Sequence, residues 1–173
     1  MLSICNMKYQ NQQGFTLVET LVAIFILVMS ITGPLFIAQQ SFTSAATARD
    51  RTTASFLAQE GVEYIRSVRD HNYLANNANW LDSLTSCVSG TCTIDTSVPT
   101  YPSIESCSGV CPVLQQTTAG LFGYQSGPET RFTRIVSMTQ VQAHEVLVEV
   151  EVRWTHKDTV RNVKVEERLF NWL

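Results

Sequence analysis

The chain has 173 residues, of which 45% are hydrophobic and 16% are charged, and its formal net charge at pH 7 is −3. This length suits one domain plus an anchor and leaves no room for two hydrophobic cores. The weak acidic excess gives no strong nucleic-acid signal, because such binding depends on lysine and arginine contacts to phosphates.

The apolar residues are concentrated near the N-terminus. A polar leader, residues 1–14, ends at Gly14, and an apolar run follows over residues 15–38, with Glu19 as its only charged residue. About 20 apolar residues cross a hydrocarbon core of ~30 Å, so the run predicts a transmembrane helix. A charge in such a segment costs roughly 2.5–3.5 kcal/mol on insertion scales, which makes Glu19 a candidate functional residue.

The residues around the start of this run resemble a known motif. Gly14 followed by Phe15-Thr16-Leu17-Val18-Glu19 resembles the prepilin cleavage and N-methylation motif of type IV pilins and pseudopilins. The resemblance implies cleavage after Gly14 by a prepilin peptidase/N-methyltransferase and methylation of the new Phe15 amine. It also implies assembly with other pilin subunits at an inner-membrane platform, with Glu19 meeting the Phe15 amine of a neighbouring subunit and setting the axial register.

The leader bears on topology. Lys8 is its only charged residue, and a basic residue before an apolar helix favours a cytoplasmic N-terminus. We therefore expect a single-pass membrane protein whose residues after about 40 lie outside the cytoplasm, and a cell-surface or periplasmic filament after assembly. Met7 is an alternative start, and a chain that began there would lack Cys5.

An ordinary signal peptide is the competing interpretation. The sequence Ala46-Thr47-Ala48 has the small-x-small form of a cleavage site. It lies well beyond the apolar run, which is itself longer than a typical signal-peptide core of about 7–15 residues. This interpretation also gives no role to Glu19.

The helix is expected to continue past the membrane. Gly33-Pro34 should bend it or melt it locally, because proline removes one hydrogen bond and clashes with the preceding turn. Residues 39–70 then predict an amphipathic helix that enters the exported domain. Its apolar stripe, which we assign to core packing, is Leu57, Gly61, Tyr64, Ile65 and Val68.

Residues 71–128 are rich in Asn, Ser, Thr, Gly and Pro and predict a loop region. Four clustered cysteines in an exported segment favour a disulfide framework, for which three connectivities are possible. We favour local pairs, because each brackets a loop that contains glycine; the pairs are Cys87–Cys92 and Cys107–Cys111. A zinc site is the alternative, but no histidine lies nearby and the usual ligand spacing is missing.

Residues 129–173 predict an antiparallel sheet. Phe132–Val141 is one candidate strand, residues 146–155 alternate between apolar and polar side chains, and Val160–Phe170 returns after a turn at 156–159. The predicted fold is α+β, with a long N-terminal helix packed on the C-terminal sheet and the cysteine-containing loop region between them. The pilin resemblance implies the same fold.

The sequence offers no catalytic chemistry, and we expect neither a cofactor nor a metal. Phosphate-binding loops, nucleophile elbows and histidine pairs at metal spacing are missing. We interpret the histidines as capping or solvent-facing, and the strand carboxylates Glu149, Glu151, Glu166 and Glu167 as exposed. The basic residues could form a mildly basic patch, but acids are interleaved with them; they are Arg131, Arg134, Arg153, Lys157, Arg161 and Lys164.

The role within a filament system is predicted from diffuse features. The cysteine-rich loop and the sequence Val-Glu-Val-Glu-Val-Arg-Trp over residues 148–154 look most like a minor pilin of the PilV type. The alternatives are a pseudopilin of a type II secretion or DNA-uptake system, or a major pilin. A more remote alternative is a membrane-anchored binding ectodomain that never polymerises.

Overall fold

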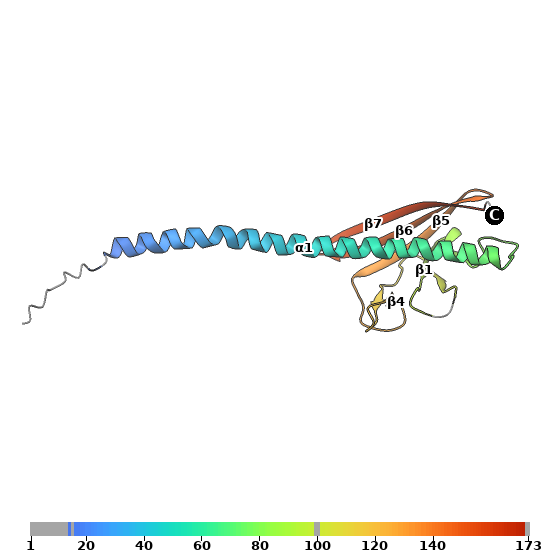
Figure 1. Ribbon diagram of the computed structural model, residues 1–173, viewed down its shortest axis with the longest axis horizontal. Coiled ribbons are helices and arrows are strands. Elements are labelled where there is room, and N and C mark those ends of the chain that lie inside the picture. Colours follow the sequence, from blue (N-terminus) through green and yellow to red (C-terminus); the bar gives the residue numbers. More distant parts are fainter. Residues whose placement is uncertain (1–13, 15, 99–100, 172–173) are drawn as a thin grey trace, which may run out of the picture. The chain divides into compact units, whose positions relative to one another are not determined.

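The computed structural model describes residues 14, 16–98 and 101–171 (Figure 1). These residues form two compact units, one ending at Ala45 and the other beginning at Ala46. Helix α1, Leu17–Leu74, contributes its first part to one unit and its second part to the other. All strands belong to the second unit, which we call the head.

In the first unit no other described part of the chain packs against α1. Every described side chain up to Ala45 is exposed. Among the described residues, α1 is also the one helix that is long and apolar enough to cross a membrane. The helix passes through Gly33 and Pro34 without interruption, so the local melting that we considered does not occur, and the bend stays a prediction.

In the head α1 is amphipathic, as predicted. Its buried residues recur at helical spacing and include Leu57, Gly61, Ile65 and Val68. The helix ends at Leu74 and not at residue 70, so the expected loop begins one turn later. Asn72 explains the extra turn, because this buried side chain donates from Nδ2 to the carbonyl oxygens of Trp80 (3.2 Å) and Asp82 (2.9 Å).

The main sheet has five antiparallel strands in the order β2-β1-β5-β6-β7. Strands β5 (Phe132–Gln142), β6 (Glu145–His156) and β7 (Thr159–Phe170) form the predicted meander. The β6–β7 turn has positive φ at Lys157 (48°) and Asp158 (62°), which is the backbone twist that a two-residue hairpin loop requires.

The predicted loop region is more ordered than expected. It contains the short helix α2 (Thr85–Val88) and the strands β1 (Thr91–Ile94) and β2 (Ile104–Ser106), which extend the main sheet beyond β5. Strands β3 (Gln115–Gln116) and β4 (Phe122–Gly123) form a separate two-stranded ladder. The sheet is therefore built from two segments of the chain and not from the C-terminal segment alone.

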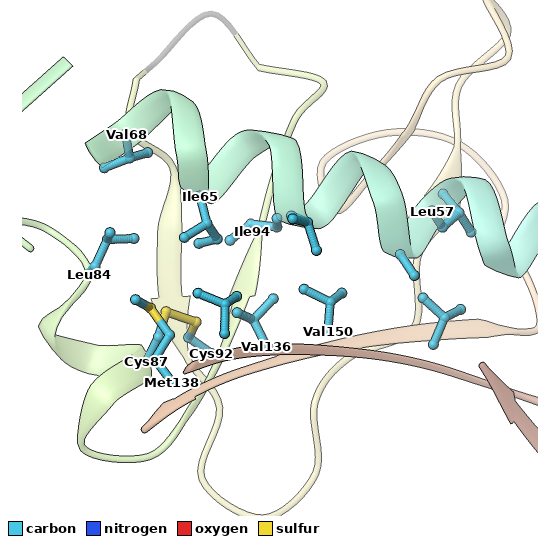
Figure 2. Close-up of a cluster of buried hydrophobic side chains, with 14 of the residues drawn as sticks. Leu57, Ile65, Val68, Leu84, Cys87, Cys92, Ile94, Val136, Met138 and Val150 are labelled. Atoms are coloured by element: carbon cyan, nitrogen blue, oxygen red, sulfur yellow. A yellow bond between two sulfur atoms is a disulfide. The ribbon is translucent and has the colours of Figure 1, made fainter. Parts of the chain in front are cut away.

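The core of the head lies between α1 and one face of the sheet (Figure 2). Val146, Val148, Val150, Val152 and Trp154 alternate along β6 with less buried residues, as their period of two predicts. The helix and the sheet approach each other closely at Gly61, where an added Cβ would lie 2.9 Å from Cγ1 of Val150.

Two disulfides join the local cysteine pairs that the sequence favours. Cys87–Cys92 lies in the core and ties α2 to β1, and Cys107–Cys111 follows β2. With the thiols paired, the zinc alternative loses its ligands. Nowhere in the described part of the chain do three or more His, Cys, Asp or Glu side chains form a group that could hold a metal ion.

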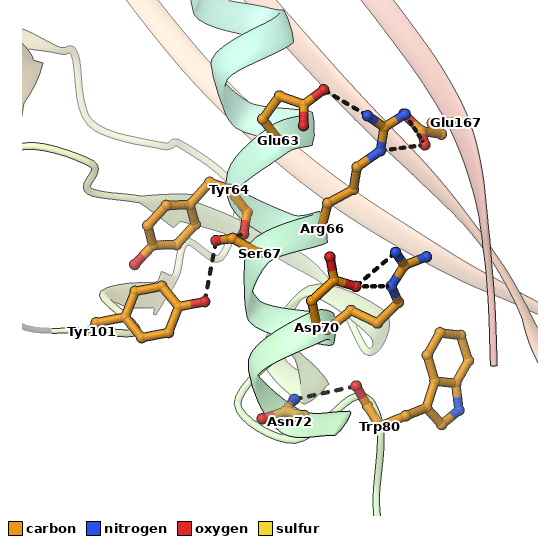
Figure 3. Close-up of polar contacts among 10 residues, drawn as sticks. Glu63, Tyr64, Arg66, Ser67, Asp70, Asn72, Trp80, Tyr101 and Glu167 are labelled. Atoms are coloured by element: carbon orange, nitrogen blue, oxygen red, sulfur yellow. Dashed lines mark hydrogen bonds and ion pairs between the residues drawn. The ribbon is translucent and has the colours of Figure 1, made fainter. Parts of the chain in front are cut away.

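Polar contacts also join α1 to the sheet, and two of them correct the sequence interpretation. Arg134 is fully buried and does not belong to a basic surface patch; it donates to the carbonyl of Ile94 (2.8 Å) and to Glu60 Oε2 (3.0 Å). Glu167 points toward α1 and accepts from Arg66 Nε (2.7 Å), as Figure 3 shows. Arg134 lies two residues from Val136, and Glu167 lies two residues from Leu169, so both side chains share the face of the sheet that bears the core.

Candidate processing and assembly site

The residues of the predicted cleavage motif lie at the start of α1. Gly14 is exposed, and a Cβ added to it would meet no described atom within 4 Å. Packing within the chain therefore gives no reason for glycine at this position. Phe15 and the leader residues 1–13, including Lys8 and Cys5, lie outside the described residues.

Thr16 caps the helix. Its Oγ1 accepts from the N–H of Glu19 (3.3 Å), and its carbonyl accepts from the N–H of Thr20 (3.2 Å). Ser, Thr, Asp and Asn are preferred at this position because their oxygens satisfy free N–H groups of the first turn. The Thr-x-x-Glu spacing of Thr16 and Glu19 is that of a capping box, a signal that the sequence analysis did not use.

Glu19 is an exposed acid in the first turn of α1. A negative charge there is favourable because the N-terminal end of a helix carries a partial positive charge. Among the described residues, no side chain or N-terminal group pairs with its carboxylate. None of its neighbours along the helix carries a charge, so an electrostatic partner for Glu19 has to come from outside the described residues.

The surface around Glu19 is apolar on every side of the helix. Leu17, Val18, Ile26 and Leu27 point to four different sides of the helix, and all are between 59% and 79% exposed. A helix that is apolar all round belongs in a membrane or in the core of a larger assembly. Five hydroxyls in this segment or just beyond it donate to carbonyls of the preceding turn, which satisfies them without water; they belong to Thr20, Ser30, Thr32, Ser41 and Thr43.

The histidines do not converge on a common site. The His71 ring packs edge-on against Tyr101 at a centroid distance of 5.3 Å, whereas His156 Nδ1 lies 3.6 Å from Asp50 Oδ2. Neither contact could be predicted from the sequence, because each histidine and its partner lie far apart along the chain.

The predicted strand carboxylates, apart from Glu167, form ion pairs along the sheet, and the expectation that Glu151 is exposed is wrong, because its side chain is only 14% exposed. Lys164 lies 2.6 Å from Glu149 and 3.0 Å from Glu166, and the hydrogen bond to Glu149 raises the pKa of its ammonium group. A hydrogen bond from Arg153 lowers the pKa of Glu151. These pairs neutralise each other and provide no general acid or base.

Residues 9–33 match the sequence profile of the prokaryotic N-terminal methylation motif. The match covers less than half of the chain, and it includes Gly14, Glu19 and the first turns of α1. No curated protein and no solved structure is significantly similar to the chain. Together with the exposed apolar helix, the match supports a type IV pilin-like, membrane-anchored protein, a type of structural subunit that is processed by prepilin peptidase and assembles with other pilins.

Proposed function

We propose that the chain is a minor pilin-like subunit of a type IV pilus. The peptide bond between Gly14 and Phe15 is hydrolysed by a prepilin peptidase, the new Phe15 amine is methylated, and the apolar part of α1 enters the core of a filament. The observation that carries this proposal is that the methylation motif overlaps the first part of α1, in which every described apolar side chain up to Ala45 is exposed.

The proposed role of Glu19 follows from charge. Hydrolysis leaves a carboxylate on the leader and an ammonium group on Phe15 of the mature chain. In a core of packed apolar helices an unpaired carboxylate is costly, and a nearby ammonium group offsets much of that cost. Pairing between Glu19 and the Phe15 amine of a neighbouring subunit would favour one axial offset between helices and so set the register.

The head supports the proposed topology. Disulfides persist in oxidising compartments outside the cytoplasm, and the head contains two of them. The proposed precursor is a single-pass membrane protein, which an inner-membrane platform could assemble. It has a cytoplasmic leader that contains Lys8, then one apolar span, and then an exported head. A bend at Gly33-Pro34 belongs to the same proposal, because Pro34 has no N–H to donate to the carbonyl of Ser30.

The subunit's exact role rests on the head. Its cysteine-rich segment and the Val-Glu-Val-Glu-Val-Arg-Trp strand favour a minor pilin of the PilV type. A pseudopilin of a type II secretion or DNA-uptake system, or a major pilin, would use the same N-terminal helix. The abundance of this chain in sheared filaments distinguishes a minor from a major subunit. A non-polymerising ectodomain would instead keep its leader.

The assembly step is tested by Glu19→Ala, with Thr20→Ala as the matched control in the same turn. The Thr20 hydroxyl donates to the carbonyl of Leu17 (2.8 Å), so Thr20→Ala removes a hydrogen bond within the helix and leaves the charge of this turn unchanged. We expect Glu19→Ala to be processed normally but depleted from sheared filaments, and Thr20→Ala to be incorporated like the wild type. Incorporation of processed Glu19→Ala at the wild-type level would contradict the proposed role.

A further inference from the structure

Two small hollows lie where α1 ends, and Trp80 lines both of them. Their volumes are about 270 and 280 Å³. The first lies between the last turn of α1, where Tyr73 is 44% exposed, and Asn171 after β7. The second lies between the loop after α1, helix α2 and Gln140 at the end of β5.

The loop that carries Trp80 is held in place by its own hydrogen bonds. Asn72 donates to the carbonyl of Trp80 (3.2 Å), and the N–H of Leu81 donates to Asn79 Oδ1 (3.0 Å). Leu81 and Leu84, which follow directly, are buried in the core. Figure 3 shows the Asn72 amide reaching the main chain of Trp80 while the indole points away from Asn72. The main chain at Trp80 is therefore held in place, and the Trp80 side chain itself is partly buried against the core.

The lining of both hollows is polar but uncharged. None of the described residues that line them is Asp, Glu, Lys or Arg. Five carry side-chain amides, namely Asn76, Asn77, Asn79, Gln140 and Asn171. The amides of Asn76, Gln140 and Asn171 make no hydrogen bond to another residue that the structure describes, so they are available to a ligand.

This lining selects a ligand by its chemistry. An amide both donates and accepts hydrogen bonds, so it suits a group that does the same, such as a hydroxyl. A charged ligand would find no counter-ion in either hollow and would lose hydration without compensation. An indole face provides a rigid apolar surface at a small cost in conformational entropy. A molecule with many hydroxyls and apolar C–H faces matches all three features.

We propose that the head binds a neutral saccharide across Trp80. Each hollow is slightly smaller than the ~300 Å³ at which pockets for drug-sized ligands begin, so each suits about one sugar ring. Because both hollows share the indole, the ligand is an oligosaccharide with at least two consecutive uncharged units. This inference does not depend on the proposed cleavage or assembly.

The test uses the full chain in a detergent that contains no sugar, since a glycoside detergent would compete. Chitohexaose, cellohexaose and maltohexaose are titrated by calorimetry, with heparin as the anionic comparison. An unstructured, uncharged peptide of Gly and Ser is titrated as the polypeptide comparison. We expect at least one neutral hexasaccharide to bind with a Kd in the millimolar range or tighter, and neither comparison ligand to bind.

Three variants locate the site. Trp80→Ala should weaken binding by about tenfold or more, and Gln140→Leu/Asn171→Leu, which keeps the indole and removes one amide from each hollow, should also weaken it. Phe56→Ala removes an aromatic that is 66% exposed and lines neither hollow, so it should bind like the wild type. Thermal unfolding confirms that each variant is folded.

The proposal is overturned if none of the three hexasaccharides binds at millimolar concentration. It is equally overturned if both Trp80→Ala and the double variant bind like the wild type. Binding of heparin or of the Gly-Ser peptide with the same dependence on Trp80 would assign the hollows to an anion or to a polypeptide and would also reject a neutral saccharide.

Discussion

The two parts of α1 belong to one continuous helix, yet they differ in what covers them. Up to Ala45 every described side chain is exposed, whereas Ala54, Ile65 and Val68 in the head have no exposed area. The second part folds against its own sheet, and the first part has no such cover among the residues that the structure describes. The difference indicates that the first part depends on lipid or on other subunits, while the head is stabilised internally.

The largest contrast is expected from the same substitution in each part. Ile65→Ala should destabilise the head by about 2–5 kcal/mol, because it removes a fully buried side chain and leaves a cavity. Ile24→Ala, at a residue that is 63% exposed, should leave the unfolding free energy of the head within about 0.5 kcal/mol of the wild type. Urea unfolding of the full chain in detergent measures both. Equal losses would show that the two parts are not distinct.

A matched pair of glycines sharpens the comparison. Gly61→Ala places a methyl group 2.9 Å from Val150 Cγ1 and should cost about 1–3 kcal/mol through overpacking. Gly33→Ala meets no described atom within 4 Å, and alanine is the better helix former, so this change should not lower helix stability. The same unfolding experiment, together with helix content by circular dichroism, measures both. A neutral Gly61→Ala would indicate that α1 lies farther from β6 than the structure places it.

The smallest effect is expected on the outer face of the sheet. Glu151 accepts from Arg153 (2.6 Å) and Asn162 (2.8 Å), and the bond from Arg153 lowers the pKa of the Glu151 carboxyl. The hydrogen-bonded pair therefore stabilises the head at pH values above the ordinary pKa of a carboxyl group. This contribution is lost as the pH falls through the lowered pKa of Glu151. Because the Arg153 side chain is 53% exposed, Glu151→Gln should cost less than about 1 kcal/mol at neutral pH.

The pH dependence provides the control for this last substitution. The carboxylate of Glu129 makes no hydrogen bond or ion pair with another described residue, so Glu129→Gln should keep the wild-type acid sensitivity. Glu151→Gln should lose less stability than the wild type between neutral and acid pH. Identical stability profiles for the wild type and Glu151→Gln across that range would contradict the assignment.

Features that depend on neighbours in sequence were predictable. The α+β fold, the buried alternation along β6 and the turn at Lys157 and Asp158 each follow from a local pattern, and the structure confirms them. The capping role of Thr16 could also have been predicted, because the Thr-x-x-Glu spacing marks the start of a helix.

Features that depend on distant partners were not predictable. The sequence indicates that Arg134 is a surface residue. In the structure its guanidinium donates to Ile94 and Glu60, which come from two other segments of the chain. Strand β1 has only four residues, and its place in the sheet is set by pairing with β5 about 45 residues later. The hollows around Trp80 likewise combine the loop after α1 with residues far along the chain, Gln140 in one hollow and Asn171 in the other.

The most direct test of the account is the intact mass of the protein purified from membranes of a host with a prepilin peptidase. We predict a mature chain that lacks residues 1–14 and carries one methyl group at Phe15, whereas Gly14→Leu should remain at full length and Gly33→Leu should be processed. A wild-type chain that keeps its leader, or that begins after Ala48, would contradict the assignment of α1 as a processed assembly helix.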